Sequence, residues 1–394
     1  MKNNFKFLGK FRFRSIIINI LVSLSIFLVF TVVIEIVLRA THLFGAHLSW
    51  TENDSILGYR FIPNSKYWVY NENDHPITGR FNSYGWRDKE WSLEKPENVY
   101  RIAVLGDSMV EAMQVESDRT FLALTEQQLS GNHKLSVELL NFGRSGYTQT
   151  EELLVLKNEV ELFSPEMVIV FFLPLNDIKD VSKETALELL RPFYIVSEKE
   201  ELIIDTSFVN LRKYKNRTGF KKHSALLSLI NDRYNSYRQQ LTINKRTKCI
   251  ETMEISKWGM DKYLSLCTSN PDTTYLKNYQ LNKMLIKAMA KYCKEKGIRF
   301  MLVTIDTDAY IPKIEEKYKY IDPTFDANFF EDDLKNYATS LSIEYLGLQR
   351  IFRQAYENTS VSLHWGHWNY EGHKVVASAL SGKLKSIIAQ VKDW

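Results

Sequence analysis

Short, continuously apolar runs that alternate with helical patterns constrain the fold of this chain more than any other feature. The longest run, Met167–Leu173, reads MVIVFFL, and similar runs occupy Tyr100–Leu105, Val137–Leu140 and Phe300–Ile305. Strands that alternate with helices of about 10–15 residues indicate βαβ units and a parallel sheet. Strands without a polar side are covered by helices on both faces. We therefore predict a three-layer α/β/α domain with a mostly parallel sheet.

The remaining pattern predicts the helices and one edge strand of this domain. Helical spacing covers Phe121–Leu129, Glu151–Leu162, 276–297 and Gly372–Val391. Gly297 stands where a helix C-terminal cap is expected, and Ile343–Leu346 is expected as an edge strand. Residues 181–275 break the alternation and are expected to form a long insertion.

The N-terminus has the pattern of a membrane segment. Ser15–Ile34 holds twenty residues without a charge, and five cations but no acid precede it. At about 1.5 Å per residue this spans roughly 30 Å, the thickness of a bilayer core. The cation excess predicts a cytoplasmic N-terminus and an extracytoplasmic remainder. A cleaved signal peptide is the alternative, although its apolar region would be shorter and no small-x-small cleavage site follows here. Glu35 and Arg39 are expected to pair at the interface.

These patterns predict three segments. Residues 1–40 form a cytoplasmic tip and transmembrane anchor, residues 41–98 form a polar, aromatic-rich lead-in, and residues 99–394 form the α/β domain with its insertion. The lead-in is expected to pack on the main domain, with a spacer from the membrane as the alternative.

Composition excludes some classes of protein. With 45% hydrophobic residues in 394, the chain can build a packed core and is not disordered as a whole. The net charge of +4 is segregated: residues 206–250 carry eleven Lys or Arg and one acid. Because the remainder is acidic, a nucleic-acid partner is not expected. The basic segment could instead attract an anionic glycan or lipid headgroups.

Three cysteines are too few for a disulfide scaffold, and no Cys-x-x-Cys pair suggests zinc. In an oxidising exterior, Cys249 and Cys267 could form a bridge. Cys293, in a helical pattern, is expected to be a buried thiol.

Polar side chains follow each predicted strand, at the edge where sites form in open parallel sheets. Gly106-Asp107-Ser108 follows the first strand, Asn141–Gly146 the second and Leu175-Asn176-Asp177 the third, and His364–Asn369 lies near the C-terminus. A serine on a strand-to-helix turn can act as a nucleophile, and a late histidine can take its proton. Glycine N–H groups and an Asn amide can stabilise an oxyanion.

In this order the blocks resemble the SGNH (GDSL) hydrolase superfamily, of its membrane-anchored bacterial envelope type. VLGDSMVEA is similar to the first block, which makes Ser108 the nucleophile and its N–H an oxyanion donor. NFGRSGYT and FLPLND place further oxyanion donors at Gly146 and Asn176. HWNYEGH places the general base at His367. The resemblance covers residues 101–180 and about 276–391, and it implies a flavodoxin-like SGNH fold.

One departure concerns the acid that orients the histidine. The family has an Asp two or three residues before it, where this chain has Trp365 and His364. Three outcomes stay open: a backbone carbonyl serves in a Ser–His dyad, an acid from elsewhere serves, or activity is reduced or lost. Asp306 and Asp308, just after a predicted strand, are the candidate acids.

The resemblance implies an extracytoplasmic serine esterase or O-acyl transfer enzyme acting on an ester, plausibly an acetyl group of an envelope glycan. Trp365 and Trp368 are expected to line a sugar-binding cleft, with core packing as the alternative. No metal or organic cofactor is implied. The alternative function is an inactive SGNH scaffold that binds glycan or an envelope assembly partner. A lipase-like enzyme is a third hypothesis.

Overall fold

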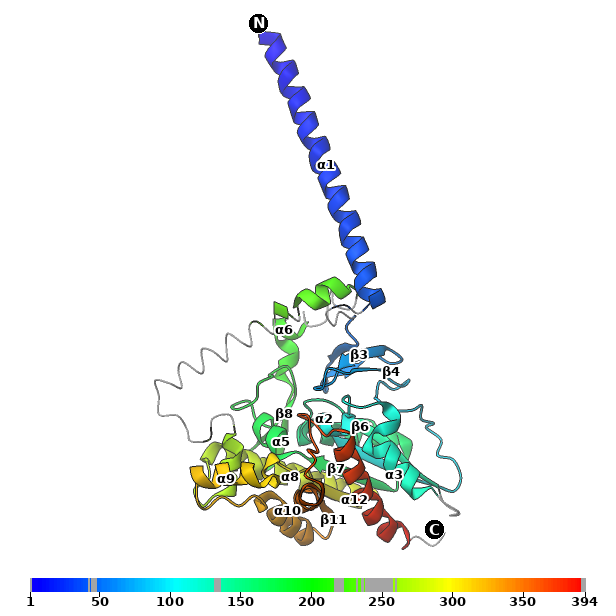
Figure 1. The fold of residues 1–394 in the computed structure, drawn as a ribbon, viewed down its shortest axis with the longest axis vertical. Helices are drawn as coiled ribbons and strands as arrows, with labels where there is room; N and C mark the ends of the chain where they lie inside the picture. The colour runs from blue at the N-terminus through cyan, green and yellow to red at the C-terminus, as the bar shows by residue number, and fades with distance from the viewer. Residues whose placement is uncertain are drawn as a thin grey trace. The chain divides into compact units, whose positions relative to one another are not determined.

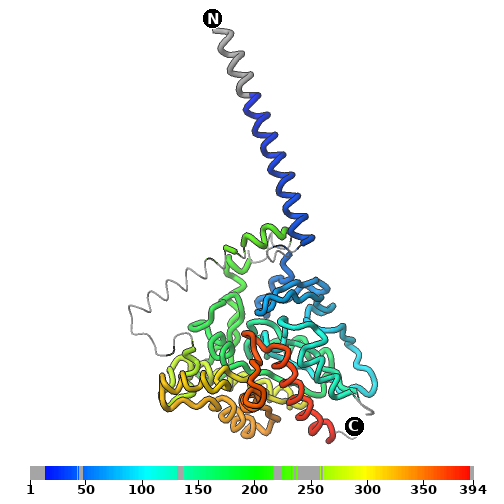
Figure 2. Tube along the Cα trace, in the orientation of Figure 1, coloured from blue at the N-terminus to red at the C-terminus, as the bar shows by residue number. Residues whose placement is uncertain are grey.

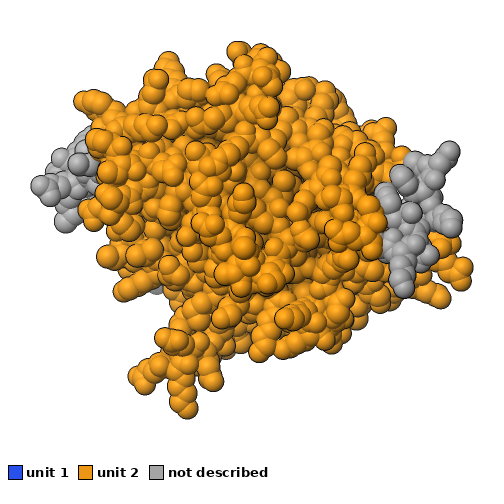
Figure 3. Space-filling model, turned by 90° about the horizontal axis from the view of Figure 1, so that it is seen from below, with its two compact units in different colours: residues 1–49, 218–245 blue, residues 50–217, 246–394 orange. Residues whose placement is uncertain are grey.

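The computed structural model describes residues 2–41, 43, 48–130, 136–215, 223–231, 233–234, 237, 258 and 261–390, with side chains from Arg14 onward. The chain divides into two compact units. One comprises residues 1–49 and 218–245, and the other, orange in Figure 3, comprises residues 50–217 and 246–394.

A five-stranded parallel sheet forms the centre of the second unit (Figure 1). Its strand order is β11-β10-β7-β5-β6. The strands are β5 (Val99–Gly106), β6 (Ser136–Gly143), β7 (Met167–Phe172), β10 (Arg299–Thr304) and β11 (Glu344–Gly347). The four predicted runs are thus strands of one sheet, and the predicted edge strand β11 lies at its edge. The predicted three-layer α/β/α class is confirmed.

Helices cover both faces of this sheet. They are α2 (Ser108–Glu111), α3 (Phe121–Leu129), α4 (Gln149–Asn158), α5 (Pro174–Asp180), α8 (Thr273–Glu295), α9 (Pro312–Ile321), α10 (Phe329–Ser340), α11 (Gln349–Thr359) and α12 (Tyr370–Ile388). Val168, Val170 and Phe172 of β7 belong to one core cluster with α4, α8 and α10, whereas Ile169 and Phe171 belong to another with α3, α11 and α12. Each buried side chain of this size contributes about 1.5–3 kcal/mol. This two-sided burial explains the run MVIVFF.

Capping residues set the helix boundaries that periodicity alone left approximate. The helix predicted over 276–297 begins at Thr273 because the Asp272 side chain accepts hydrogen bonds from the N–H groups of Thr274 and Tyr275. It ends at Glu295, and Gly297 follows with φ +72°. The last helix begins at Tyr370, capped by Asn369.

The lead-in segment folds as two antiparallel hairpins. β1 (Thr51–Asp54) pairs with β2 (Gly58–Phe61), and β3 (Lys66–Tyr70) pairs with β4 (Pro76–Arg80). The hairpins share a small apolar core made of Phe61, Tyr67, Ile77 and Phe81. They belong to the same compact unit as the sheet.

Described parts of residues 181–275 include a third hairpin, β8 (Phe193–Val196) with β9 (Leu202–Asp205), and the short helix α6 (Arg212–Lys215). Cys293 is buried in α8, as expected. Cys267 is also buried and carries a free thiol, which contradicts the predicted bridge to Cys249, a residue outside the described ranges.

The first unit is dominated by α1 (Lys2–Thr41), whose trace is drawn in Figure 2. Among the described residues it is the one helix long and apolar enough to cross a membrane, over Arg14–Thr41, a property that a signal sequence shares. The predicted pair is present, with Arg39 Nε 2.6 Å from Glu35 Oε1.

Candidate active site

The candidate nucleophile, Ser108, is the first residue of α2, directly after β5. Asp107 caps this short helix, its Oδ1 accepting a hydrogen bond from the Met109 N–H at 2.9 Å. Gly143, at the end of the neighbouring β6, allows the close approach of α2, because a Cβ there would lie 2.4 Å from the backbone nitrogen of Glu111. The tight strand-to-helix turn thus presents Ser108 at the carboxyl edge of the sheet.

The candidate base, His367, lies on the loop that precedes α12. Its Nε2 is 2.8 Å from Ser108 Oγ, although 259 residues separate the two along the chain. A local bridge between His364 and Trp368 shapes this loop, and the Trp365 N–H donates to the His367 carbonyl oxygen at 2.9 Å. The geometry is suited to proton transfer from serine to imidazole.

The second ring nitrogen of His367 contacts an acid from an unexpected part of the chain. Nδ1 forms a very short hydrogen bond with Oε1 of Glu72, in the turn between β3 and β4. A carboxylate at Nδ1 fixes the tautomer in which Nε2 can accept a proton. Ser108, His367 and Glu72 therefore form a continuous Ser–His–acid chain.

His367 and Glu72 each stabilise the charged form of the other. Burial opposes the charged imidazole, but the hydrogen bond and charge of Glu72 outweigh it, and the pKa of His367 lies above its usual value. Burial likewise opposes the Glu72 carboxylate, yet the hydrogen bond from His367 lowers its pKa. Glu72 thus stays ionised, and a carboxylate at this position can stabilise a positive charge on the His367 imidazole.

Three N–H groups from the predicted sequence blocks are candidate oxyanion donors. Within the described residues, the N–H groups of Ser108 and Gly146 have no hydrogen-bond partner. Asn176, on α5 just after β7, donates from Nδ2 to Asp107 Oδ2 at 2.8 Å and so lies beside the nucleophile turn. Gly146 has φ +75°, a conformation that suits glycine.

The loop that carries Gly146 is held by Glu111, the last residue of α2. The buried Glu111 carboxylate accepts hydrogen bonds from the backbone N–H of Ser145, at 2.9 Å, and from the Ser145 hydroxyl. Burial raises the pKa of Glu111, an effect that these hydrogen bonds partly offset. The nucleophile helix and the second sequence block are thus coupled directly.

The prediction that Asp306 or Asp308 orients the base is wrong in this structure. Asp306 is buried and accepts a hydrogen bond from Trp368 Nε1 at 3.1 Å, and its carboxyl lies 3.3 Å from His364 Nε2. Burial raises its pKa well above the usual value. Burial also raises the pKa of Asp308, which begins a 3-10 turn instead of contacting His367. The acid that contacts Nδ1 of His367 is Glu72.

The two candidate lining tryptophans differ. Trp368 is fully buried and packs against Phe121, Phe171 and Phe352, so it does not line a cleft. The prediction of a lining role is therefore wrong for Trp368, and the core-packing alternative holds. Trp365 is half-buried with its ring edge-on to Tyr370, and its lining role stays a prediction.

No signal in the sequence could have identified Glu72. It stands in the polar turn Asn71-Glu72-Asn73-Asp74, which reads as an ordinary hairpin connection. The candidate acids Asp306 and Asp308 lie 61 and 59 residues before His367 in the sequence, whereas Glu72 lies 295 residues away. Two Asn71 hydrogen bonds, accepted by its side chain from the N–H groups of Asn73 and His75, shape the turn that presents Glu72.

A cleft of about 460 Å³ adjoins this site. It is lined by Trp50, Thr51, Tyr59, Phe61, Val69, Tyr70, Asn71, Glu72, Glu111, Met113, Gln114 and Ser145. The lining thus combines aromatic rings with two carboxylates and contains no Lys or Arg.

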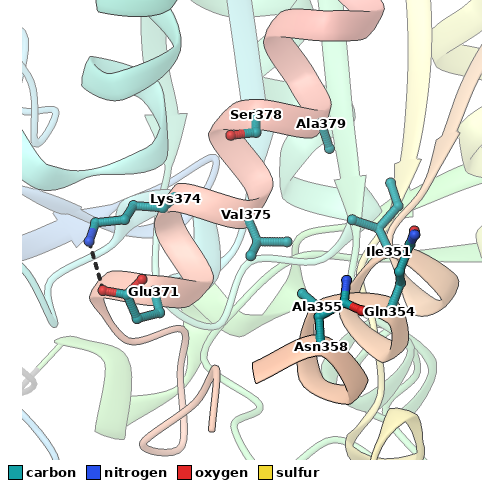
Figure 4. A pocket seen from close by; sticks show the side chains of 9 residues that line it. All are labelled: Ile351, Gln354, Ala355, Asn358, Glu371, Lys374, Val375, Ser378 and Ala379. Carbon is teal, nitrogen blue, oxygen red and sulfur yellow. Dashed lines mark hydrogen bonds and ion pairs between the residues drawn. The ribbon is translucent and has the colours of Figure 1, made fainter. Parts of the chain in front are cut away.

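Another hollow, between α11 and α12, is lined by none of the candidate site residues (Figure 4). Across the described ranges, no group of three or more His, Cys, Asp and Glu side chains is arranged to hold a metal ion.

No protein-family model and no curated protein matches this chain. Solved structures similar to its fold include a lipolytic protein of the G-D-S-L family from Desulfitobacterium hafniense, at 12% identity and TM-score 0.35, over 72% of this chain and 99% of that one. A psychrotrophic esterase from Pseudoalteromonas sp. matches at 12% identity and TM-score 0.37, over 74% and 100%. An acetyl xylan esterase variant from Geobacillus stearothermophilus matches at 12% and 0.36, over 72% and 94%.

At these identities and TM-scores, the matches assign neither an activity nor a substrate to this chain. The residues of the four sequence blocks, however, meet around Ser108 at the carboxyl edge of a parallel sheet. In both its sequence blocks and its α/β/α architecture, the chain therefore resembles the SGNH (GDSL) hydrolase superfamily.

Proposed function

We propose that this chain is a serine esterase or O-acyl transfer enzyme in which Ser108 is the nucleophile, His367 the general base and Glu72 the orienting acid. The observation that carries the proposal is the pair of contacts made by His367: Nε2 lies 2.8 Å from Ser108 Oγ, and Nδ1 is hydrogen-bonded to Glu72. A serine, an imidazole and a carboxylate in this order are the parts required for acyl transfer.

The reaction proceeds in two halves. Ser108 Oγ attacks the ester carbonyl carbon as its proton passes to His367 Nε2. The resulting oxyanion accepts hydrogen bonds from the N–H groups of Ser108 and Gly146 and from the Asn176 amide. Collapse of this intermediate breaks the ester bond, and the leaving alcohol takes the proton from Nε2.

The second half resolves the acyl-enzyme. Water, or a sugar hydroxyl in a transferase, gives its proton to His367 Nε2 and attacks the acyl carbon. Release of the acid, or of the new ester, returns the proton to Ser108 Oγ. Glu72 keeps its charge throughout and stabilises the imidazolium in both halves.

The cleft beside Glu72 supports a substrate with a neutral hydroxylated alcohol. Two carboxyl groups, those of Glu72 and Glu111, line the cleft, and no Lys or Arg lines it to balance an anionic group. Tyr70, 56% exposed, offers an aromatic face to apolar ring edges. An acetylated glycan has this chemistry, and the N-terminal segment supports a site of action at the membrane, outside the cytoplasm.

A fluorophosphonate probe tests the proposal on the full chain in detergent. We expect labelling of the wild type, loss of labelling in Ser108→Ala, and retained labelling in Ser65→Ala, a serine outside the site. Turnover of p-nitrophenyl acetate should follow the same pattern. Absence of both labelling and turnover in the wild type would contradict the enzyme and favour an SGNH scaffold that binds glycan or an assembly partner. An inactive scaffold would account for a His367 without an orienting acid. Because Glu72 contacts His367 Nδ1, this reason for an inactive scaffold is weaker.

A further inference from the structure

Residues 223–229 contact α1, and the catalytic proposal does not use this contact. Residues 225–231 are helical, as are 233–234 and 237, and we refer to these described residues as the capped helix. Ala225 is fully buried, and it packs with Leu226 and Leu229 against Ile34 and Leu38 of α1. The capped helix is therefore fixed to the C-terminal end of α1.

Glu35 holds the start of the capped helix. Its carboxylate accepts hydrogen bonds from the Ser224 hydroxyl at 2.8 Å and from the N–H groups of Ala225 at 2.8 Å and Leu226 at 3.0 Å. Arg39 completes the arrangement by donating to Glu35 and, at 2.6 Å, to the carbonyl oxygen of His223. A carboxylate at the first N–H groups of a helix is a favourable cap. Glu35, at the end of the apolar stretch, thus binds the first N–H groups of the capped helix and holds that helix against α1.

The capped helix contacts α1 directly after the uncharged stretch of the sequence. Ser15–Ile34 is the uncharged stretch that spans roughly 30 Å of hydrocarbon. The residues that hold the capped helix follow within about one and a half turns; they are Glu35, Leu38 and Arg39. If the uncharged stretch spans the hydrocarbon, this contact falls at the level where hydrocarbon gives way to headgroups. Figures 1 and 2 show its described residues running crosswise to α1.

An apolar and aromatic stripe is exposed along the capped helix. Its members, spaced i, i+3, i+7 and i+10, are Leu227 (44% exposed), Ile230 (55%), Tyr234 (58%) and Tyr237 (63%). This spacing places them on one face of a helix. A second face, with Ala225 and Leu229, is already occupied by α1. Large apolar side chains with tyrosines are typical of helices that lie in a membrane interface.

We propose that the capped helix lies in the plane of the bilayer surface at the C-terminal end of α1, with Leu227, Ile230 and Tyr237 inserted among lipid headgroups and upper acyl chains. The surrounding sequence favours an anionic lipid surface, because residues 206–250 carry eleven Lys or Arg against one acid. This proposal rests on the anchor, not on the catalytic chemistry. The chain then contacts the membrane through two helices instead of one.

Depth measurements on the full chain in phosphatidylcholine–phosphatidylglycerol vesicles test this arrangement. A fluorophore is attached at Ile230→Cys, with Phe27→Cys as the bilayer reference and Tyr320→Cys, from a 92% exposed position, as the aqueous reference. The parent chain supplies the background of the native cysteines. We expect quenching by lipids with brominated tails at Ile230→Cys to exceed that at Tyr320→Cys by about threefold and to stay below that at Phe27→Cys.

Quenching at Ile230→Cys equal to that at Tyr320→Cys, with Phe27→Cys strongly quenched, would overturn the interfacial helix and keep the anchor. Weak quenching at Phe27→Cys would overturn both. A second variant addresses the stripe itself: Ile230→Glu should reduce brominated-lipid quenching at Leu227→Cys, whereas the matched Tyr320→Glu should leave it unchanged. An unchanged signal in Ile230→Glu would also contradict the proposal.

Discussion

The loops of the sheet and the hairpins of the lead-in contribute to the candidate site in different ways. Ser108 and Asn176 follow β5 and β7, so backbone pairing between parallel strands fixes where they stand. Glu72 comes from a hairpin with its own small core, and its position depends on how side chains attach that hairpin to the sheet domain. The sheet itself therefore positions the candidate nucleophile, whereas the position of the candidate acid depends on how the hairpin docks on the sheet domain.

Arg87 is central to that contact. It is 3% exposed and donates to the Tyr67 hydroxyl of β3 at 2.9 Å, to the Glu111 carbonyl oxygen at 3.0 Å and to the Val115 carbonyl oxygen at 2.5 Å. One guanidinium thus joins the hairpin that carries Glu72 to the end of the nucleophile helix.

The largest effect is expected at the base. His367→Ala removes the group that accepts the serine proton, and kcat/KM for p-nitrophenyl acetate should fall by about 10⁴-fold. The matched control is His75→Ala, a histidine of the β3–β4 turn with no contact to Ser108, which should retain activity. Near wild-type turnover in His367→Ala would refute the assigned base.

The next effect is expected at the acid. Glu72→Gln leaves the turn in place but removes the charge and the tautomer control, so kcat should fall by about 10²–10⁴-fold. Asp74→Asn makes the same chemical change two residues away and should leave kcat unaltered. Equal activity of the two variants would mean that the hairpin has no part in catalysis.

The pH profile separates an electrostatic role of Glu72 from a structural one. His367 acts as a base only when neutral, so kcat/KM should rise with pH through its pKa, which Glu72 raises. In Glu72→Gln the charge that raises this pKa is lost while burial, which lowers it, remains. The acidic limb should therefore move to lower pH, and a limb that stays in place or moves to higher pH would exclude this role.

A smaller effect is expected at the docking contact. Arg87→Met leaves buried acceptors unpaired and should lower the free energy of unfolding by about 1–3 kcal/mol. The hairpin then holds Glu72 less firmly, and we expect kcat to fall by about tenfold with little change in KM. Chemical denaturation and steady-state kinetics measure the two effects. Full activity in a destabilised variant would show that Glu72 is held without Arg87.

The smallest effect is expected at Asp306, one of the two candidate acids that the sequence offered. Asp306→Asn keeps an oxygen that can accept from Trp368 Nε1, and kcat/KM should change by less than about threefold. A loss of kcat/KM as large as that of Glu72→Gln would make Asp306 the orienting acid. The acid would then come from the sheet domain and not from the hairpin.

Local sequence patterns were sufficient for most of the fold. Phe121–Leu129 was predicted to the residue, and all five sheet strands were predicted within a few residues, because two-sided burial leaves an unbroken apolar run that is visible in the sequence. Trp368 shows the limit of such patterns, since an aromatic residue beside a catalytic histidine can face either the cleft or the core. Its contact with the buried Asp306 places it in the core.

The sequence by itself determined the α/β/α class, the membrane-type segment and the candidate positions Ser108, Gly146, Asn176 and His367. Each of these follows from a short stretch of chain, either a periodicity or a polar residue at the end of a strand. Only the tertiary structure decided which acid meets His367, because that contact joins residues 295 positions apart through the packing of a hairpin. The same holds for Glu35 and the capped helix, 190 residues further along the chain. These two contacts depend on packed surfaces between distant segments, and no local pattern at Glu72 or Glu35 indicates their partners.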